Sequence, residues 1–261
     1  MNILSAKKIR DNLKTEYQEI YISVFDCIDS TNDEAKRQWK ETKTAPAIFV
    51  SDKQTAGRGR RGRTFYSPEG TGIYMSLLLQ PESGLEDAVH ITTATAVVVA
   101  KALKQYLGAE VGIKWVNDLY FKNKKVCGIL TEAVMEANPA ETPAVVVGIG
   151  INLSTEVFPE ELQGIAGGFG VGADAVERNE LVASIVNGLL DFAKDLKDCS
   201  FVDEYREMSV VLGKEIRYNE GDALIRARAL DIDSEGGLMV ELADGSVKVL
   251  KTGEITVRLE E

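Results

Sequence analysis

The chain has 261 residues, of which 44% are hydrophobic and 27% are charged, and it carries a formal net charge of −11 at pH 7. This length allows one large domain, or a large and a small one, with a full hydrophobic core. The negative charge argues against affinity of the whole protein for nucleic acid or for an anionic membrane, because both are polyanions.

Histidine and cysteine are scarce. The single histidine, His90, excludes a multi-histidine metal site and nearly excludes a serine–histidine catalytic triad. The three cysteines lie far apart and form no CxxC pair, which indicates reduced thiols. The longest uncharged apolar run is too short to cross a bilayer, and the N-terminus lacks the apolar core of a signal peptide. We therefore expect a cytoplasmic protein.

The spacing of apolar residues predicts alternating helices and strands in the first half of the chain. Helices are expected at residues 5–14, from residue 30 onward and at 89–107, and strands at 21–25, 47–51 and 72–79. Ser5 is the expected N-cap of the first helix. Thr31 and Glu34 have the spacing of a capping box at the start of the second helix. Gly108 follows the third helix, as a C-cap glycine does.

The second half begins with a predicted hairpin. Strands are expected at 111–115, 118–121, 126–132 and 144–149, with a tight antiparallel turn at 122–124. An amphipathic helix is expected at 181–196, and short strands follow at 215–218, 224–231, 238–242, 247–250 and 255–259, with a hairpin turn at Asp244-Gly245. The expected fold is α+β. A mixed, largely antiparallel sheet flanked by helices occupies residues 1–208, and a small β-barrel domain occupies residues 209–261.

Residues 53–63 (KQTAGRGRRGR) form the most informative segment. They contain five cations, three glycines and no anion, in a strongly acidic chain. Arginine binds phosphate through a planar fork of donors, and glycine lets backbone N–H groups approach an anion. Such a loop repels itself when empty and is ordered by an anionic ligand, so it is a candidate lid. A solvated charge run or an RNA-binding segment is the alternative.

Two further segments place small or polar residues near strand ends. The first is KWVND at residues 114–118 followed by KVCG at 125–128, where Lys125 could hold a carboxylate and stabilise charge at a phosphate. An exposed hairpin lysine is the alternative. The second is GIGIN at residues 148–152, where a substrate could lie against the sheet. The GIGIN segment is not a GxGxxG pattern, and the chain contains no P-loop pattern.

Three other features have structural explanations. Cys127 has no histidine nearby in sequence and is expected to be a buried apolar residue. His90, at the start of a helix, is expected to be structural. Residues 167–172 (GGFGVG) follow no clear strand and are expected to form a mobile loop, with nucleotide contact as a weak alternative.

The segments GRGRRGR, KWVNDLYFKNKKVCGIL and GIGIN, in this order and after Ser30-Thr31-Asn32, resemble those of biotin–protein ligases. The GEITVR segment at 253–258 also resembles the family's last strand. The resemblance implies a catalytic domain similar to those of class II aminoacyl-tRNA synthetases, and a small SH3-like barrel. It implies an ATP-dependent, AMP-forming ligase. Biotin and MgATP would give biotinyl-5′-AMP, which a lysine of a biotin carboxyl carrier domain then attacks.

The roles that the family implies can be carried over residue by residue. Residues that resemble the biotin site are Ser30, Thr31, Asn32, Gln54, Gly57, Arg58, Gly59, Arg60, Lys125, Gly128 and Gly148. Residues that resemble the ATP and adenylate site are Arg60, Arg63, Phe65, Lys114, Asn117, Asn152 and Arg258. Lys125 and Arg60 are the expected catalytic residues, and no residue is assigned to a metal.

Within the biotin site, the resemblance divides the residues by the part of biotin they would contact. Ser30, Thr31 and Gln54 are expected to hydrogen-bond the ureido head. Gly128 and Gly148 are expected to form the floor of the channel that holds the valerate chain.

Other positions set further expectations. Residues 57–60 match the loop that closes over the ligand, and Phe65 stands where relatives often have the tryptophan that faces adenine. Val116 stands where the family usually has proline.

The resemblance also sets expectations for cofactor and partners. Mg²⁺ is expected with ATP, and a homodimer is an open expectation. No operator binding is expected, because the chain starts almost directly at the catalytic domain. A lipoate– or octanoate–protein ligase, which shares the fold and the adenylate chemistry, is the alternative.

Overall fold

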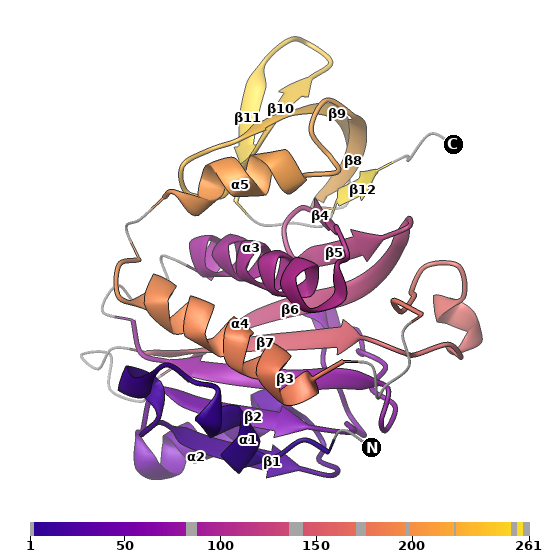
Figure 1. Cartoon of the computed structure of the whole chain (residues 1–261). Coiled ribbons are helices and arrows are strands. Elements are labelled where there is room, and N and C mark those ends of the chain that lie inside the picture. Colours follow the sequence, from indigo (N-terminus) through magenta and orange to yellow (C-terminus); the bar gives the residue numbers. More distant parts are fainter. Residues whose placement is uncertain are drawn as a thin grey trace.

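The computed structural model describes residues 3–81, 88–135, 143–170, 176–196, 199–221, 223–251 and 255–257. In these residues the strands form two sheets. One has seven strands in the order β1-β2-β3-β7-β6-β5-β4, and the other has five in the order β11-β10-β9-β8-β12. The smaller sheet lies at one end of the molecule, beyond α3 and next to α5 (Figure 1).

The large sheet is mixed and largely antiparallel, as predicted. Its strands are β1 (Tyr21–Phe25), β2 (Ala47–Ser51), β3 (Gly72–Leu79), β4 (Gly112–Lys114), β5 (Asp118–Phe121), β6 (Lys124–Val134) and β7 (Ala144–Asn152). The pairing of β1 with β2 is parallel, and the other pairings are antiparallel. The turn between β5 and β6 is shorter than predicted, because Lys124 already belongs to β6. Its two residues, Lys122 and Asn123, have φ values of 48° and 62°, which a tight two-residue hairpin turn requires.

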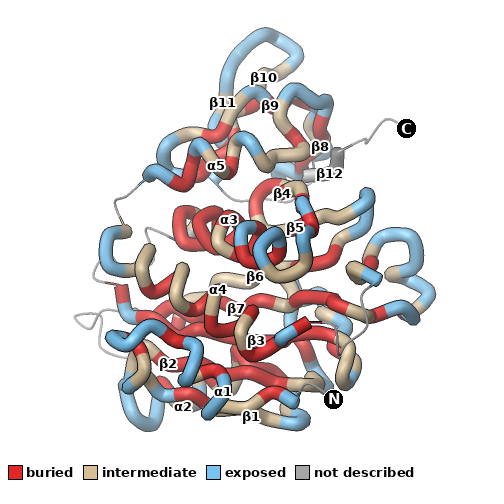
Figure 2. The backbone as a smooth tube through the Cα atoms, viewed as in Figure 1, coloured by how far each residue is buried: buried red, intermediate tan, exposed pale blue. Residues whose placement is uncertain are grey.

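Helices lie on both faces of the large sheet (Figure 1). They are α1 (Ala6–Asp11), α2 (Thr31–Thr42), α3 (Ala88–Leu107) and α4 (Arg178–Ala193), whereas α5 (Phe201–Met208) packs against α3 beside the smaller sheet. Alternate strand residues point to opposite faces. Ile48 and Val147 belong to the core shared with α3 and α4, whereas their neighbours Phe49 and Val146 pack with Trp39 of α2. Burial is accordingly most continuous in the central strands and in the helices against them (Figure 2).

The helix ends confirm two sequence predictions and correct a third. Ser5 caps α1, with its side chain accepting a hydrogen bond from the Lys8 backbone, and Gly108 takes a positive φ of 61° after α3. The capping box at Thr31 is wrong by one residue. Ser30 is the N-cap of α2, because its hydroxyl accepts from the backbone N–H of Asp33, three residues on.

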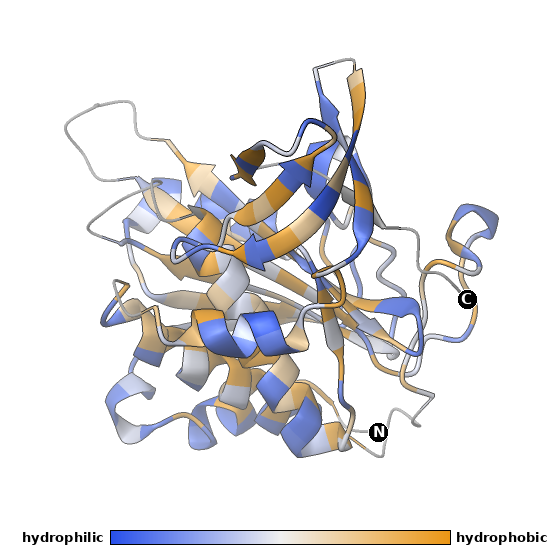
Figure 3. Ribbon diagram, turned by 90° about the horizontal axis from the view of Figure 1, so that it is seen from above, coloured by the Kyte–Doolittle hydropathy of each residue, from blue (hydrophilic) through white to orange (hydrophobic). Residues whose placement is uncertain are grey.

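The smaller sheet is antiparallel throughout. Its strands are β8 (Glu215–Glu220), β9 (Ala223–Ile232), β10 (Leu238–Leu242), β11 (Val247–Leu250) and β12 (Ile255–Val257). Apolar and polar residues alternate along its strands (Figure 3). The predicted hairpin turn is present, with Gly245 at a φ of 81°. Helix α5, which sequence reasoning missed, precedes this sheet.

The smaller sheet is fastened to the large one at the turn between β4 and β5. The Trp115 indole donates to the Gly236 carbonyl at 2.9 Å, and the Tyr205 hydroxyl of α5 donates to the Val116 carbonyl at 3.2 Å. Both contacts hold the segment that contains the KWVND motif. None of the helices in the described part of the chain is long and apolar enough to cross a membrane.

Candidate active site

A cavity of about 470 Å³ lies at the N-terminal end of α2, over the large sheet. Cavities of this size hold small-molecule ligands. The arginine loop (residues 57–63), the β5–β6 hairpin and the end of β7 surround it. The predicted site residues that line it are Ser30, Thr31, Asn32, Gln54, Arg58, Gly59, Arg60, Arg63, Phe65, Lys114, Asn117, Lys125, Gly128, Gly148 and Asn152.

Glycines on the sheet make room for the Phe65 ring. Gly128 of β6 pairs with Gly150 of β7. A Cβ at Gly150 would lie 2.5 Å from the Phe65 ring, and a Cβ at Gly128 would lie 3.2 Å from both Phe65 and Lys125. The Tyr74 ring meets Phe65 edge-on at a centroid distance of 6.4 Å. The aromatic face is therefore held close to the sheet inside the cavity.

A third glycine, Gly148, receives the Asn32 side chain. A Cβ at Gly148 would lie 2.1 Å from Asn32 Oδ1. That oxygen accepts a hydrogen bond from Ser76 Oγ at 2.6 Å, and Asn32 Nδ2 donates to Glu132 Oε2 at 2.9 Å. Space at Gly148 is thus taken by a buried amide that joins α2 to β3 and β6.

Polar groups gather where α2 begins. Gln54 Oε1 accepts from the Thr31 backbone N–H at 2.8 Å and lies 3.2 Å from the Thr31 hydroxyl, while Gln54 Nε2 donates to Ser67 Oγ at 3.0 Å. The backbone N–H of Ser30 donates to Asp29 at 2.7 Å. The guanidinium of Arg37 beside Asp29 lowers the pKa of that carboxyl to about 2. Side chains that can give or accept several hydrogen bonds are therefore fixed at this end of the cavity.

Cations from the arginine loop, β4 and β6 also line the cavity. Lys125 Nζ lies 2.6 Å from Asp118 Oδ1. Arg60 donates to Asn117 Oδ1 at 2.9 Å, and the Asn117 amide donates in turn to the Ile129 carbonyl at 2.8 Å. Lys114 Nζ lies 5.7 Å from the centre of the Tyr120 ring. Lysine and arginine side chains from three segments thus converge where a polyanion could bind.

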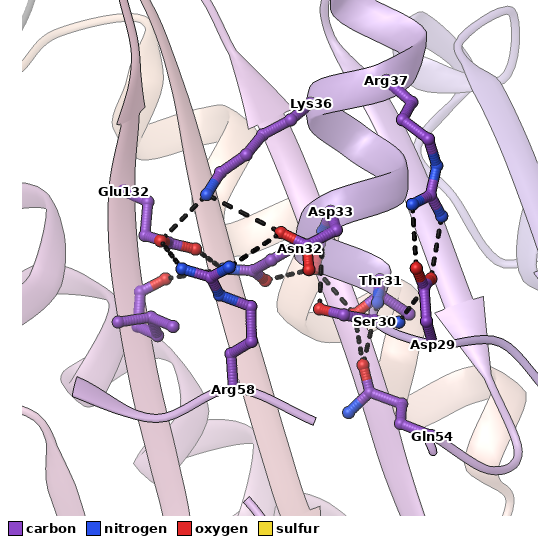
Figure 4. A network of polar contacts seen from close by, with 12 residues as sticks. Asp29, Ser30, Thr31, Asn32, Asp33, Lys36, Arg37, Gln54, Arg58 and Glu132 are labelled. Carbon is purple, nitrogen blue, oxygen red and sulfur yellow. Dashed lines mark hydrogen bonds and ion pairs between the residues drawn. The ribbon is translucent and has the colours of Figure 1, made fainter. Parts of the chain in front are cut away.

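Arg58 of the arginine loop lies between two carboxylates. Its guanidinium lies 3.1 Å from Asp33 and 2.8 Å from Glu132 (Figure 4). Burial alone would raise the pKa of Glu132, but the hydrogen bond from Asn32 and the charges of Lys36 and Arg58 lower it below its usual range. The Arg58 side chain therefore fastens the loop to α2 and β6.

Asn152 has an unused acceptor at the end of β7. The residue is 4% exposed, and its Oδ1 has no hydrogen-bond partner in the described part of the chain. A buried acceptor without a partner carries a free-energy cost that a ligand donor would remove.

One predicted site residue is not in the described part of the cavity wall, and another falls outside the described residues. Gly57 does not line the cavity. A Cβ there would lie 2.4 Å from the Phe65 carbonyl, so this glycine lets two chain segments pass closely. Arg258 lies outside the described residues, as do residues 171 and 172 of the glycine-rich loop. In the described part of that loop, the Gly167 backbone N–H donates to the Lys125 carbonyl at 2.9 Å.

Sequence reasoning missed one wall of the cavity. Residues after β7 close it with apolar side chains, namely Phe158, Leu162, Ile165 and Ala166. The Phe158 ring lies 6.1 Å from that of Tyr66, which also lines the cavity. The apolar residues of this acidic stretch were the available signal, but apart from the short 3₁₀ helix Glu160–Leu162 the stretch has no helix or strand.

The remaining sequence candidates are structural. Cys127 is fully buried, and burial raises the pKa of its thiol. His90 packs against the Phe201 ring at a centroid distance of 4.7 Å. In the described residues, no group of three His, Cys, Asp or Glu side chains is placed to hold a metal ion.

The fold and the cavity together define a ligase of the biotin protein ligase type. The solved structure of the biotin protein ligase from Aquifex aeolicus in complex with biotin and ATP is similar over 91% of this chain and 98% of that one, with a TM-score of 0.73 and 27% identity. The model of the biotin/lipoate A/B protein ligase family matches residues 24–152, and that of the biotin protein ligase C-terminal domain matches residues 211–258.

Sequence relatives agree with this class. The bifunctional ligase/repressor BirA of Bacillus subtilis is 33% identical over 94% of this chain and 77% of its own length. The biotin--[acetyl-CoA-carboxylase] ligase of Paracoccus denitrificans is 37% identical over 48% of this chain and 52% of its own. The chain belongs to the biotin/lipoate A/B protein ligase family, and it is a ligase.

Proposed function

We propose that the enzyme activates biotin with MgATP to biotinyl-5′-AMP and then transfers biotin to a lysine of a biotin carboxyl carrier domain. One observation carries the proposal: a single cavity has a fixed polar end at Thr31 and Gln54 and a cationic part around Lys125 and Arg60. The polar end suits an uncharged urea, and the cationic part suits a carboxylate that meets a phosphate.

In the first step, a carboxylate oxygen of biotin attacks the α-phosphorus of ATP, and pyrophosphate leaves. Two anions must approach each other, so the protein contributes mainly by positioning them and neutralising charge. Lys125, held by Asp118, and Arg60, held by Asn117, are the cations proposed for this role. In the second step, the acceptor amine attacks the acyl carbon, and AMP leaves with the phosphate oxygen.

The remaining cavity residues divide between the two substrates. We assign Ser30, Thr31 and Gln54 to the ureido head of biotin. The hydrogen bonds of Gln54 fix its amide, so an acid without a matching polar head would leave these groups unpaired. Asn32 would support these residues rather than bind the ureido head itself, because its amide already bonds to Ser76 and Glu132.

The nucleotide would lie on the Phe65 side. The ring of Phe65 offers a face for adenine, and the unpartnered Oδ1 of Asn152 offers an acceptor for its amino group. Arg63 and Lys114 also line the cavity and are assigned to the phosphates. Arg258 is assigned there by resemblance alone.

Five expectations remain proposals. Mg²⁺ would enter as the ATP complex, since phosphate oxygens are the ligands it prefers. The acceptor would be a biotin carboxyl carrier domain, and the need for ATP suits a cytoplasmic enzyme. A homodimer is proposed as one assembly state. A boundary between domains 1–208 and 209–261 is supported by the start of the smaller sheet at Glu215.

ATP–pyrophosphate exchange on the purified protein tests the function. We expect exchange with biotin and none with lipoate, octanoate or no added acid. Exchange with lipoate or octanoate would keep the adenylate chemistry and contradict the roles given to Gln54 and Thr31. Absence of exchange with every acid would contradict the function itself.

A further inference from the structure

Four charged side chains beside the cavity form a cluster that the proposed reaction steps do not use. Asp33 and Lys36 belong to α2, Glu132 belongs to β6, and Arg58 belongs to the arginine loop (Figure 4). We call these residues the charge quartet. Three members stand on regular elements, so Arg58 is the member that leaves if the loop moves.

Both cations of the quartet contact the same carboxylate oxygens. On Glu132 Oε1, Arg58 lies at 2.8 Å and Lys36 at 2.9 Å. On Asp33 Oδ1, Arg58 lies at 3.1 Å and Lys36 at 3.9 Å. Two positive charges that share one oxygen repel each other. Lys36 is therefore a competitor of Arg58 for Glu132.

Glu132 needs a cation in any state of the loop. Its side chain is 17% exposed, and a partly buried carboxylate without a partner is costly. If Arg58 leaves, Lys36 and the Asn32 amide remain in contact with it. The loop can thus detach without leaving a bare carboxylate behind.

The quartet is also joined to the polar end of the cavity. Asn32 donates to Glu132 and accepts from Ser76, and Ser76 Oγ lies 2.8 Å from Thr31 Oγ1. Thr31 in turn contacts Gln54. A ligand that orders Thr31 and Gln54 would therefore also order the anchor of Arg58.

We propose that the charge quartet is a latch on the arginine loop, in which Glu132 holds Arg58 and Lys36 sets how readily the loop opens. Because the loop forms part of the cavity wall, a ligand enclosed by it leaves when the loop moves. Glu132 and Lys36 are thus positioning residues that set the retention of the bound adenylate. The nature of that ligand rests on the proposed function, whereas the latch does not.

The latch makes neighbouring substitutions act in opposite directions. Glu132→Gln removes the charge that holds Arg58, so the loop should open about threefold to tenfold more readily. Lys36→Met removes the competitor and its repulsion, so the loop should open about twofold to fivefold less readily. Lys40→Met, one turn further along α2 at an exposed position, is the matched control and should change nothing. A merely structural role would make both quartet substitutions loosen the loop.

Two measurements test the latch. The first is the rate of tryptic cleavage after Arg60, Arg61 and Arg63 in the ligand-free protein, with the cut sites mapped by mass spectrometry. The second is the rate at which biotinyl-5′-AMP, formed on the enzyme from biotin and MgATP, is released. Both rates should rise in Glu132→Gln, fall in Lys36→Met and stay at the wild-type value in Lys40→Met. Rates that shift in the same direction in both quartet variants, or in neither, would overturn the latch. A wild-type protein that forms no adenylate would instead contradict the proposed function, and the cleavage rates would still decide on the latch.

Discussion

At three positions of the large sheet, what matters about a residue is that it has no side chain. Gly128 and Gly150 leave space for the Phe65 ring, and Gly148 leaves space for Asn32. These glycines have no positive φ, so close approach rather than backbone freedom explains them. The same residue type therefore admits an aromatic ring at one point of the strand and a buried amide at another.

Gly150→Ala separates these two uses. The added Cβ would lie 2.5 Å from the Phe65 ring and push it out of position, because the three atoms nearest to it all belong to that ring. We expect the KM for ATP to rise about tenfold, with little change in the KM for biotin, as judged from one stacking contact. Steady-state kinetics checks this. Because both changes act on one ring, Phe65→Ala should add little to Gly150→Ala. A full additional loss in the double variant would contradict the idea.

Lys125→Ala tests the main catalytic residue. Its ammonium, placed by Asp118, is the proposed stabiliser of charge at the α-phosphate, so adenylate formation should fall about a hundredfold or more. Pyrophosphate exchange measures that step. Lys122→Asn is the control, because it removes a lysine from the turn of the same hairpin and keeps a residue that tolerates positive φ. Normal exchange in Lys125→Ala would remove this residue from the mechanism.

At the scale of elements, the hairpin of β5 and β6 is held at the end opposite its turn. Its turn is short, so Lys125 stands near the start of β6. Its other end follows residues 115–117, which the smaller sheet and α5 hold through Gly236 and Tyr205. An element outside the cavity thus supports one that forms its wall.

Tyr205→Phe measures that support. The hydroxyl is fully buried, and burial raises the pKa of Tyr205, so its proton stays available to the Val116 carbonyl. Loss of the donor should lower the free energy of unfolding by about 1–2 kcal/mol. Chemical denaturation gives the value, with Tyr21→Phe at an exposed position of β1 as the control. Equal stability of the two variants would show that the contact contributes nothing.

For the whole molecule, the periodicity of apolar residues was enough to predict the sheet and most helices. The strands at 21–25, 47–51 and 72–79 are confirmed at both ends. The last two are buried throughout, which gives a continuous apolar signal, whereas only Ile22 is buried in the first. Helix α5 was missed although its buried residues Phe201, Val202 and Tyr205 have helical spacing. The N-cap of α2 was misplaced because Ser30 and Thr31 are both good caps, and only tertiary contacts decide between them.

The site was predictable as a set of residues but not as a set of contacts. The motifs and the family resemblance together identified about half of the residues that line the cavity. The sequence did not indicate that Arg58 contacts Glu132. These residues are 74 positions apart, and only the folding of the sheet brings them together. For the same reason, the occupant of the space at Gly148 could not be foreseen from the strand alone.

The net charge of −11 predicts that the protein does not bind operator DNA. A polyanionic duplex should be repelled by most of this surface, and the arginine loop has few cations to oppose that. An electrophoretic mobility shift with operator DNA at physiological salt should show no retardation. Binding that persists at that salt would contradict the prediction.

The positions of the two tryptophans give the protein an optical reporter. Trp39 of α2 is buried against β2 and β7, whereas Trp115 lines the cavity and donates to the Gly236 carbonyl between β9 and β10. A change of emission on ligand binding would therefore come from Trp115 and survive Trp39→Phe. The same indole would also respond when the smaller sheet moves against the large one, so a single wavelength can follow both events in time.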